Sequence, residues 1–134
     1  MFFFGTVSVR HNSKTVNQSG EIMESLIKDV NYKQITNGSI FIKKYTVILF
    51  YNKSCVGSYL TELSLNEIID EYSDIFSFYK INQDENEELS IKYKLPEKTV
   101  LLFYKYQTLI DLIPGIISKE EIKKTLNSLL ENNY

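Results

Sequence analysis

An apolar run that leads to the chain's single cysteine is the feature that most constrains how these 134 residues can fold. Residues 47–51 read VILFY, and the absence of polar alternation is typical of a β-strand that is covered on both faces. The polar corner NKS follows, then Cys55, and then apolar residues recur at helical spacing as far as Tyr72. This order predicts a sulfur atom at the carboxyl end of a buried strand and at the positive end of a helix. Both are positions where α/β folds place their chemistry.

Length and composition predict one globular domain with an ordinary core, because 43% of the residues are hydrophobic and 24% are charged. A net charge of −2 offers no basic field for nucleic acid. One cysteine cannot form an intramolecular disulfide, so the fold does not depend on an oxidising compartment. No window approaches the roughly 18 apolar residues of a membrane helix. We therefore expect a cytoplasmic protein that binds neither nucleic acid nor membranes, unless a leader was removed.

The periodicity of the whole chain predicts alternating strands and helices. The predicted strands lie at 33–36, 46–51, 75–81, 99–104 and 108–113. Helices are predicted at 21–30, 56–72, 87–93 and after Ser118, which has the capping-box partner Glu121, and a brief helical turn is predicted at 40–42. Strands joined by helices imply a parallel portion, and the last two strands imply an antiparallel hairpin. The result is an α/β fold, a central mixed β-sheet flanked by helices on both faces.

The helix after Cys55 is expected to be amphipathic, with one stripe of apolar residues facing the core. This stripe comprises Leu65, Ile68, Ile69 and Tyr72. The acidic residues of the same helix lie largely outside the stripe, and they are Glu62, Glu67, Asp70 and Glu71.

Three stretches carry the pattern of a known family. Residues 50–58 read FYNKSCVGS, where the thioredoxin family has F-W-A-x-W-C-G-P-C. Residues 79–86, YKINQDEN, resemble the family's A-K-x-N-x-D-x-N, and residues 115–126, GIISKEEIKKTL, resemble its G-x-x-S-K-x-x-L ending. The resemblance implies a thioredoxin-like domain over residues 31–134 with the thioredoxin fold. Residues 1–30 are then an N-terminal extension that contains the first predicted helix.

The resemblance also implies site residues. Cys55 stands at the family's nucleophilic cysteine, and Ser58 stands at its second, resolving cysteine. Lys53 and the start of the helix are expected to favour the Cys55 thiolate. The residues expected to line a substrate groove are Tyr51, Ser54, Val56, Gly57, Lys98 and Thr99.

Three departures from the family's pattern bear on the chemistry. A serine hydroxyl cannot resolve a mixed disulfide, so Ser58 excludes dithiol reduction by one chain. Leu49 stands where the family has a buried aspartate, whereas Lys80 keeps the lysine that is its partner. Lys98 stands at the place of the cis-proline, before Thr99, which predicts a trans peptide and a reshaped groove.

Two functions from different classes are open at this point. One is a monothiol redox protein of cell redox homeostasis, which forms mixed disulfides with protein thiols or with glutathione through Cys55. If active, it is a monothiol thiol-disulfide oxidoreductase. The other is a redox-inactive thioredoxin-fold module for protein binding or scaffolding. Retention of Cys55 favours the first, and Leu49 together with the missing cis-proline favours the second.

No cofactor and no metal site are expected from the sequence. His11 has no second histidine or cysteine near it, and the acidic run DENEE at residues 84–88 lacks the spacing of a calcium loop. The oligomeric state is left open.

Overall fold

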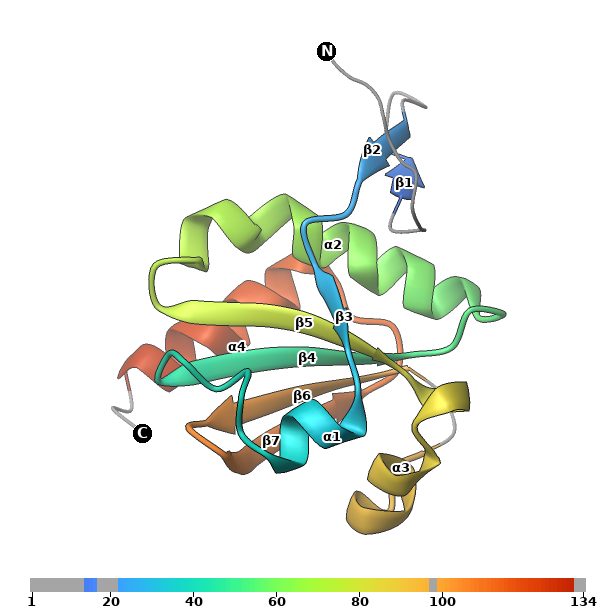
Figure 1. Ribbon diagram of the computed structural model, residues 1–134. Coiled ribbons are helices and arrows are strands. Elements are labelled where there is room, and N and C mark those ends of the chain that lie inside the picture. The colour runs from blue at the N-terminus through green and yellow to red at the C-terminus, as the bar shows by residue number, and fades with distance from the viewer. Residues whose placement is uncertain (1–13, 17–21, 97–98, 132–134) are drawn as a thin grey trace.

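The computed structural model describes residues 14–16, 22–96 and 99–131, and its centre is a five-stranded mixed sheet (Figure 1). The strands of this sheet are β3 (Lys28–Val30), β4 (Tyr45–Tyr51), β5 (Phe76–Asn82), β6 (Val100–Lys105) and β7 (Thr108–Pro114). They lie in the order β3-β5-β4-β6-β7. β3, β5 and β4 are parallel to one another, whereas β6 and β7 join as antiparallel strands. The predicted mixed sheet is therefore confirmed.

Helices cover both faces of the sheet, as predicted. The described residues form the helices α1 (Tyr32–Thr36), α2 (Val56–Tyr72), α3 (Glu87–Tyr93) and α4 (Lys119–Glu131), and a 3₁₀ turn, η2 (Gln83–Glu85), precedes α3. α2 and α4 pack on one face, and α1 and α3 lie toward the other (Figure 1). The Ser118 hydroxyl accepts the Glu121 N–H at 3.1 Å, which confirms the predicted start of α4.

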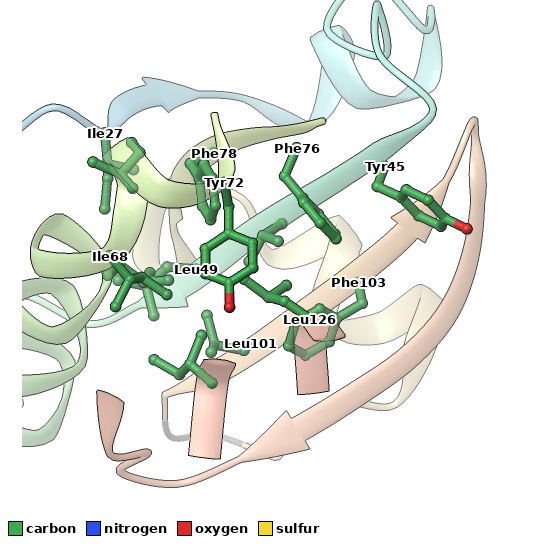
Figure 2. Packing of buried hydrophobic residues seen from close by; sticks show 14 of the residues in the cluster. Ile27, Tyr45, Leu49, Ile68, Tyr72, Phe76, Phe78, Leu101, Phe103 and Leu126 are labelled. Atoms are coloured by element: carbon green, nitrogen blue, oxygen red, sulfur yellow. The ribbon is translucent and has the colours of Figure 1, made fainter. Parts of the chain in front are cut away.

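The two fully apolar strands form the centre of the sheet. Every residue of β4 is buried, and so are the first five residues of β6. The strands pair directly, with Val47 opposite Phe103 and Leu49 opposite Leu101. Leu49, Leu101 and Phe103 belong to the core on the side of α2 and α4, together with Ile68 and Leu126 (Figure 2). The prediction that β4 is covered on both faces is therefore confirmed.

The first part of the chain departs from the prediction. The helix predicted over 21–30 is wrong, since residues 22–24 form β2 (Ile22–Glu24) and residues 28–30 form β3. β2 pairs with β1 (Lys14–Val16), and β3 pairs with β5. The apolar spacing resembled a helix because two residues three positions apart are both buried in the core, Ile27 just before β3 and Val30 at its end. The sheet thus begins at Lys28, inside the segment assigned to the extension.

The strand predicted over 33–36 is also wrong, because these residues lie in α1. The Asn31 side chain accepts the Gln34 N–H at 2.9 Å, and the Gln34 side chain accepts the Asn31 N–H at 2.9 Å. This capping box fixes the start of a short helix that its apolar pattern does not reveal. Residues 37–40 then form a turn, and no helix follows at 40–42.

None of the helices in the described part of the chain is long and apolar enough to cross a membrane.

Candidate functional site

Cys55 lies where the sequence predicts it, between the carboxyl end of β4 and the first turn of α2. It is the N-cap residue of α2 and is partly exposed. Asn52 builds the corner, because its carbonyl accepts the Cys55 N–H at 3.0 Å and its side chain accepts the Ser54 N–H at 2.8 Å. Ser58 and Tyr59 donate their N–H groups to the Cys55 carbonyl, at 3.1 and 3.4 Å. These bonds begin α2 at Cys55, so the thiol lies at the N-terminal end of the helix.

Two hydroxyl groups connect to the sulfur atom. The Thr99 hydroxyl donates to Cys55 Sγ at 3.7 Å, and Thr99 Oγ1 lies 2.5 Å from Ser58 Oγ. The Asn52 N–H donates to the same Ser58 oxygen at 3.0 Å. Because Thr99 has a single hydroxyl proton and gives it to the sulfur, Ser58 must donate to Thr99. The result is a chain of donors that runs from Ser58 through Thr99 to the sulfur.

These donors favour the thiolate form of Cys55. The pKa of the thiol is lowered, first by the Ser58 backbone N–H and then by the Thr99 hydroxyl, with smaller help from the Gly57 N–H. Partial desolvation opposes the shift. Lys53 is exposed, and its role as an activator stays a prediction.

The remaining predicted groove residues differ in their exposure to solvent. Gly57 is buried, and a Cβ at this position would lie 2.7 Å from Ile116 Cγ1. The absence of a side chain on Gly57 therefore lets the Ile116 side chain approach α2 this closely. Val56 and Ser54 are exposed beside the thiol. Lys98 lies outside the described residues, so the predicted trans peptide is untested.

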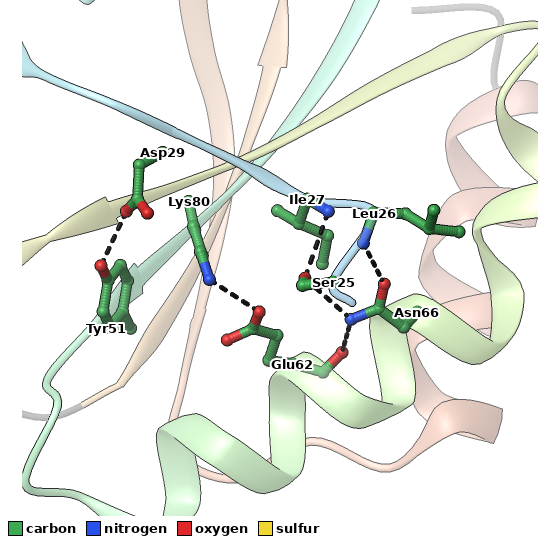
Figure 3. A network of polar contacts seen from close by, with 8 residues as sticks. All are labelled: Ser25, Leu26, Ile27, Asp29, Tyr51, Glu62, Asn66 and Lys80. Carbon is green, nitrogen blue, oxygen red and sulfur yellow. Dashed lines mark hydrogen bonds and ion pairs between the residues drawn. The ribbon is translucent and has the colours of Figure 1, made fainter. Parts of the chain in front are cut away.

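A pocket of about 380 Å³ opens beside Cys55. The lining contains a thiol, hydroxyl groups, an amide and four charged side chains. These groups belong to Asp29, Tyr51, Asn52, Lys53, Cys55, Ser58, Tyr59, Glu62 and Lys80. Tyr51, one of the predicted groove residues, donates its hydroxyl to Asp29 Oδ1 at 2.7 Å (Figure 3). Burial and this contact raise the pKa of Tyr51, which keeps its hydroxyl protonated.

A buried ion pair forms the inner part of this pocket. Lys80 Nζ lies 2.8 Å from Glu62 Oε2, and the two residues are 5% and 9% exposed (Figure 3). Lys80 has Leu49 as its register partner on β4 and Asp29 as its register partner on β3. Carboxylates therefore enter the pocket from β3 and α2, whereas the β4 position carries a core leucine.

Sequence reasoning missed both acidic residues of the pocket. Glu62 was expected outside the core-facing stripe, and this is wrong because it is buried against Lys80. The spacing of Cys55, Ser58 and Glu62, three residues and then four, places them on one helix face and would have revealed it. Asp29 was missed because its segment was predicted as a helix, whereas β3 aligns it with Lys80.

The fold that these residues build is thioredoxin-like. No protein-family model matches the chain. Thioredoxin-T of Drosophila melanogaster is 31% identical over 80 residues, which cover 60% of this chain and 51% of that protein. The thioredoxins of Pyropia yezoensis and Porphyra purpurea are 23% and 22% identical over 107 residues, which cover 79% of this chain and 96% of each relative. The chain thus spans about half of the Drosophila relative and nearly all of the other two. Fold and relatives together support the thioredoxin-like class.

Proposed function

We propose that this chain is a monothiol redox protein in which Cys55 forms mixed disulfides. The observation that carries the proposal is the sulfur atom itself, partly exposed at the start of α2 and contacted by the Thr99 hydroxyl at 3.7 Å. A thiolate is the nucleophile of disulfide exchange, and this environment lowers the pKa of the thiol. The similarity to thioredoxins supports redox chemistry in general.

The reaction follows from one sulfur. The Cys55 thiolate attacks a disulfide R–S–S–R′, a Cys55–S–S–R bond forms, and the R′–S⁻ thiolate leaves. No electrons are gained or lost overall, because one disulfide replaces another. Ser58 offers no second thiol, so the mixed disulfide is resolved by a thiolate from outside the chain, which takes the R–S group and restores the Cys55 thiolate. We place this chemistry in cytoplasmic redox homeostasis, since no disulfide within the chain needs an oxidising compartment.

Reaction with a neutral disulfide tests the proposal. The full chain is incubated with bis(2-hydroxyethyl) disulfide, and the adduct is measured by intact-protein mass spectrometry. We expect one adduct, which forms faster as the pH rises through the pKa of Cys55 and which a reductant removes. The Cys55→Ser variant should form none. A native protein that forms no adduct unless denaturant is added would contradict the proposal.

A redox-inactive binding module is the second candidate. The observation in its favour is apolar surface beside the thiol, where Val56 and Ile116 are 70% and 65% exposed. The proteins that bind to the chain from a cell extract distinguish the two functions. Partners lost after reduction and absent with Cys55→Ser indicate thiol chemistry, whereas partners that withstand both changes indicate a binding module.

A further inference from the structure

The pocket beside Cys55 carries charges of both signs within a volume suited to a small molecule. Ligand pockets commonly occupy about 300–1,000 Å³, and this one has about 380 Å³. Asp29 and Glu62 supply carboxylates, and Lys53 and Lys80 supply ammonium groups. A pocket with charges of both signs disfavours a ligand that bears one sign only, because two of its four charged side chains would then repel it.

The inner charges are held in place and keep bonding capacity. Lys80 and Glu62 are more than nine-tenths buried, and the Lys80 ammonium lies 5.4 Å from the centre of the Tyr51 ring. An ammonium has three N–H donors and a carboxylate has two oxygens, so the 2.8 Å bond between them uses one of each. Asp29 is oriented by the Tyr51 hydroxyl at 2.7 Å. The pocket is therefore preorganised to pair with a ligand's ammonium and carboxylate groups.

We infer that this pocket binds a low-molecular-weight thiol or disulfide that carries both an ammonium and a carboxylate group, as a cysteine-containing amino acid or short peptide does. Its carboxylate pairs with Lys80 or Lys53, and its ammonium pairs with Glu62 or Asp29. Cys55 lines the same pocket, so the ligand's sulfur lies beside the thiolate. This inference rests on the proposed function and names its substrate class.

The reaction is disulfide exchange with this ligand as R. The Cys55 thiolate attacks one sulfur of the symmetric disulfide R–S–S–R, the Cys55–S–S–R bond forms, and R–S⁻ leaves with the electron pair of the broken bond. The pocket holds the R group that stays attached to Cys55. A second molecule of R–S⁻ can reverse the step.

The test compares disulfides that differ in charge, with the full chain and adduct formation followed by intact mass. The probes are glutathione disulfide with both charges, cystamine with ammonium groups only, dithiodipropionate with carboxylates only and neutral bis(2-hydroxyethyl) disulfide. Each rate is divided by the rate of the same probe with the urea-unfolded chain, which removes intrinsic reactivity. We expect glutathione disulfide to exceed the other three by about tenfold or more, as charge-assisted hydrogen bonds allow.

A double variant and a matched control assign the preference to the pocket. Glu62→Gln with Lys80→Met removes both buried charges at similar volume, which spares the fold the cost of one unpaired buried charge. Glu67→Gln with Lys119→Met removes an exposed pair, 3.4 Å apart, that joins α2 to α4. The first should abolish the preference and the second should keep it. If the first variant does not fold by circular dichroism, Asp29→Asn at the exposed edge replaces it and should reduce the preference severalfold.

The possible outcomes distinguish failure of this inference from failure of the proposed function. No adduct with any probe overturns the proposed function, and this inference with it. Equal normalised rates for all four probes, or equal rates for glutathione disulfide and one single-sign probe, overturn the inference and leave the proposed function standing. A preference that survives the removal of the pocket charges, or that the control loses equally, also overturns it.

Discussion

At Cys55, a sulfur atom, two hydroxyl groups and a backbone amide form one hydrogen-bonded chain. The resemblance places Cys55, Ser58 and Thr99 at the site, and the structure brings these three residues together. Their order of donation could not be read from the sequence, since it depends on Thr99, the residue just before β6, lying against the start of α2. Glu62 and Asp29 could not be placed by apolar periodicity, because a buried charge is defined by its partner and not by its own hydropathy.

Replacing Thr99 should raise the pKa of Cys55. Thr99→Val keeps the shape and removes the hydroxyl that donates to the sulfur, so the thiolate loses a donor and less of it is present at pH 7. The pH midpoint of iodoacetamide alkylation should move upward, and the buried Ser58 hydroxyl should lose its acceptor at a cost of about 1–3 kcal/mol. Ser54→Ala, at an exposed neighbouring position, should leave the midpoint in place. An unchanged midpoint in Thr99→Val would mean that this contact does not act on the thiol.

Ser58→Cys should create a disulfide with Cys55. Ser58 lies one turn along α2 on the same face, and serine and cysteine have nearly the same shape. Mild oxidation should therefore remove two hydrogens, as seen by mass spectrometry under non-reducing conditions. Ser54→Cys, which precedes the helix, is the control and should oxidise less readily. Two free thiols in oxidised Ser58→Cys would contradict the geometry of the helix start.

Among the elements, α2 carries the site and the Lys80–Glu62 pair ties it to β5. The strands and helices from β4 onward could be predicted because their apolar residues follow strand or helix periodicity consistently. β3 and α1 could not, since each is five residues or shorter and is defined by pairing or capping rather than by periodicity.

Removing one partner of the buried Lys80–Glu62 ion pair should destabilise the protein. Glu62→Leu leaves the Lys80 ammonium buried without its carboxylate, at a cost of about 3–5 kcal/mol. Adding Lys80→Met should recover most of this loss, because no buried charge is then left unpaired. Urea unfolding measures both. Glu67→Leu breaks an exposed pair and should change the free energy of unfolding by less than about 1 kcal/mol. Equal losses in the single and double variants would contradict the claim that an unpaired Lys80 ammonium causes the loss.

For the whole molecule, the sheet order places β4 between β5 and β6, and β6 between β4 and β7. Nearly all residues of both strands are buried. Their backbone amides should therefore exchange most slowly with deuterium, and those of the edge strand β7 should exchange faster. The mixed sheet with helices on both faces followed from the order of apolar strands and helices, and the resemblance implied its thioredoxin-like form. Fast exchange in β4 or β6 under native conditions would contradict this arrangement.

The pH dependence of Cys55 alkylation in the native, full-length chain tests the central claim most directly. The donors around the sulfur lower its pKa, so the reactive thiolate should form with a midpoint below the free-cysteine value of about 8.5. The same shift means that folding favours the thiolate, so this contribution to stability is present above the unfolded pKa and is lost as the pH falls through the folded pKa. A midpoint below the free value supports a nucleophilic Cys55. A midpoint at or above it, or no labelling unless denaturant is added, would contradict the account.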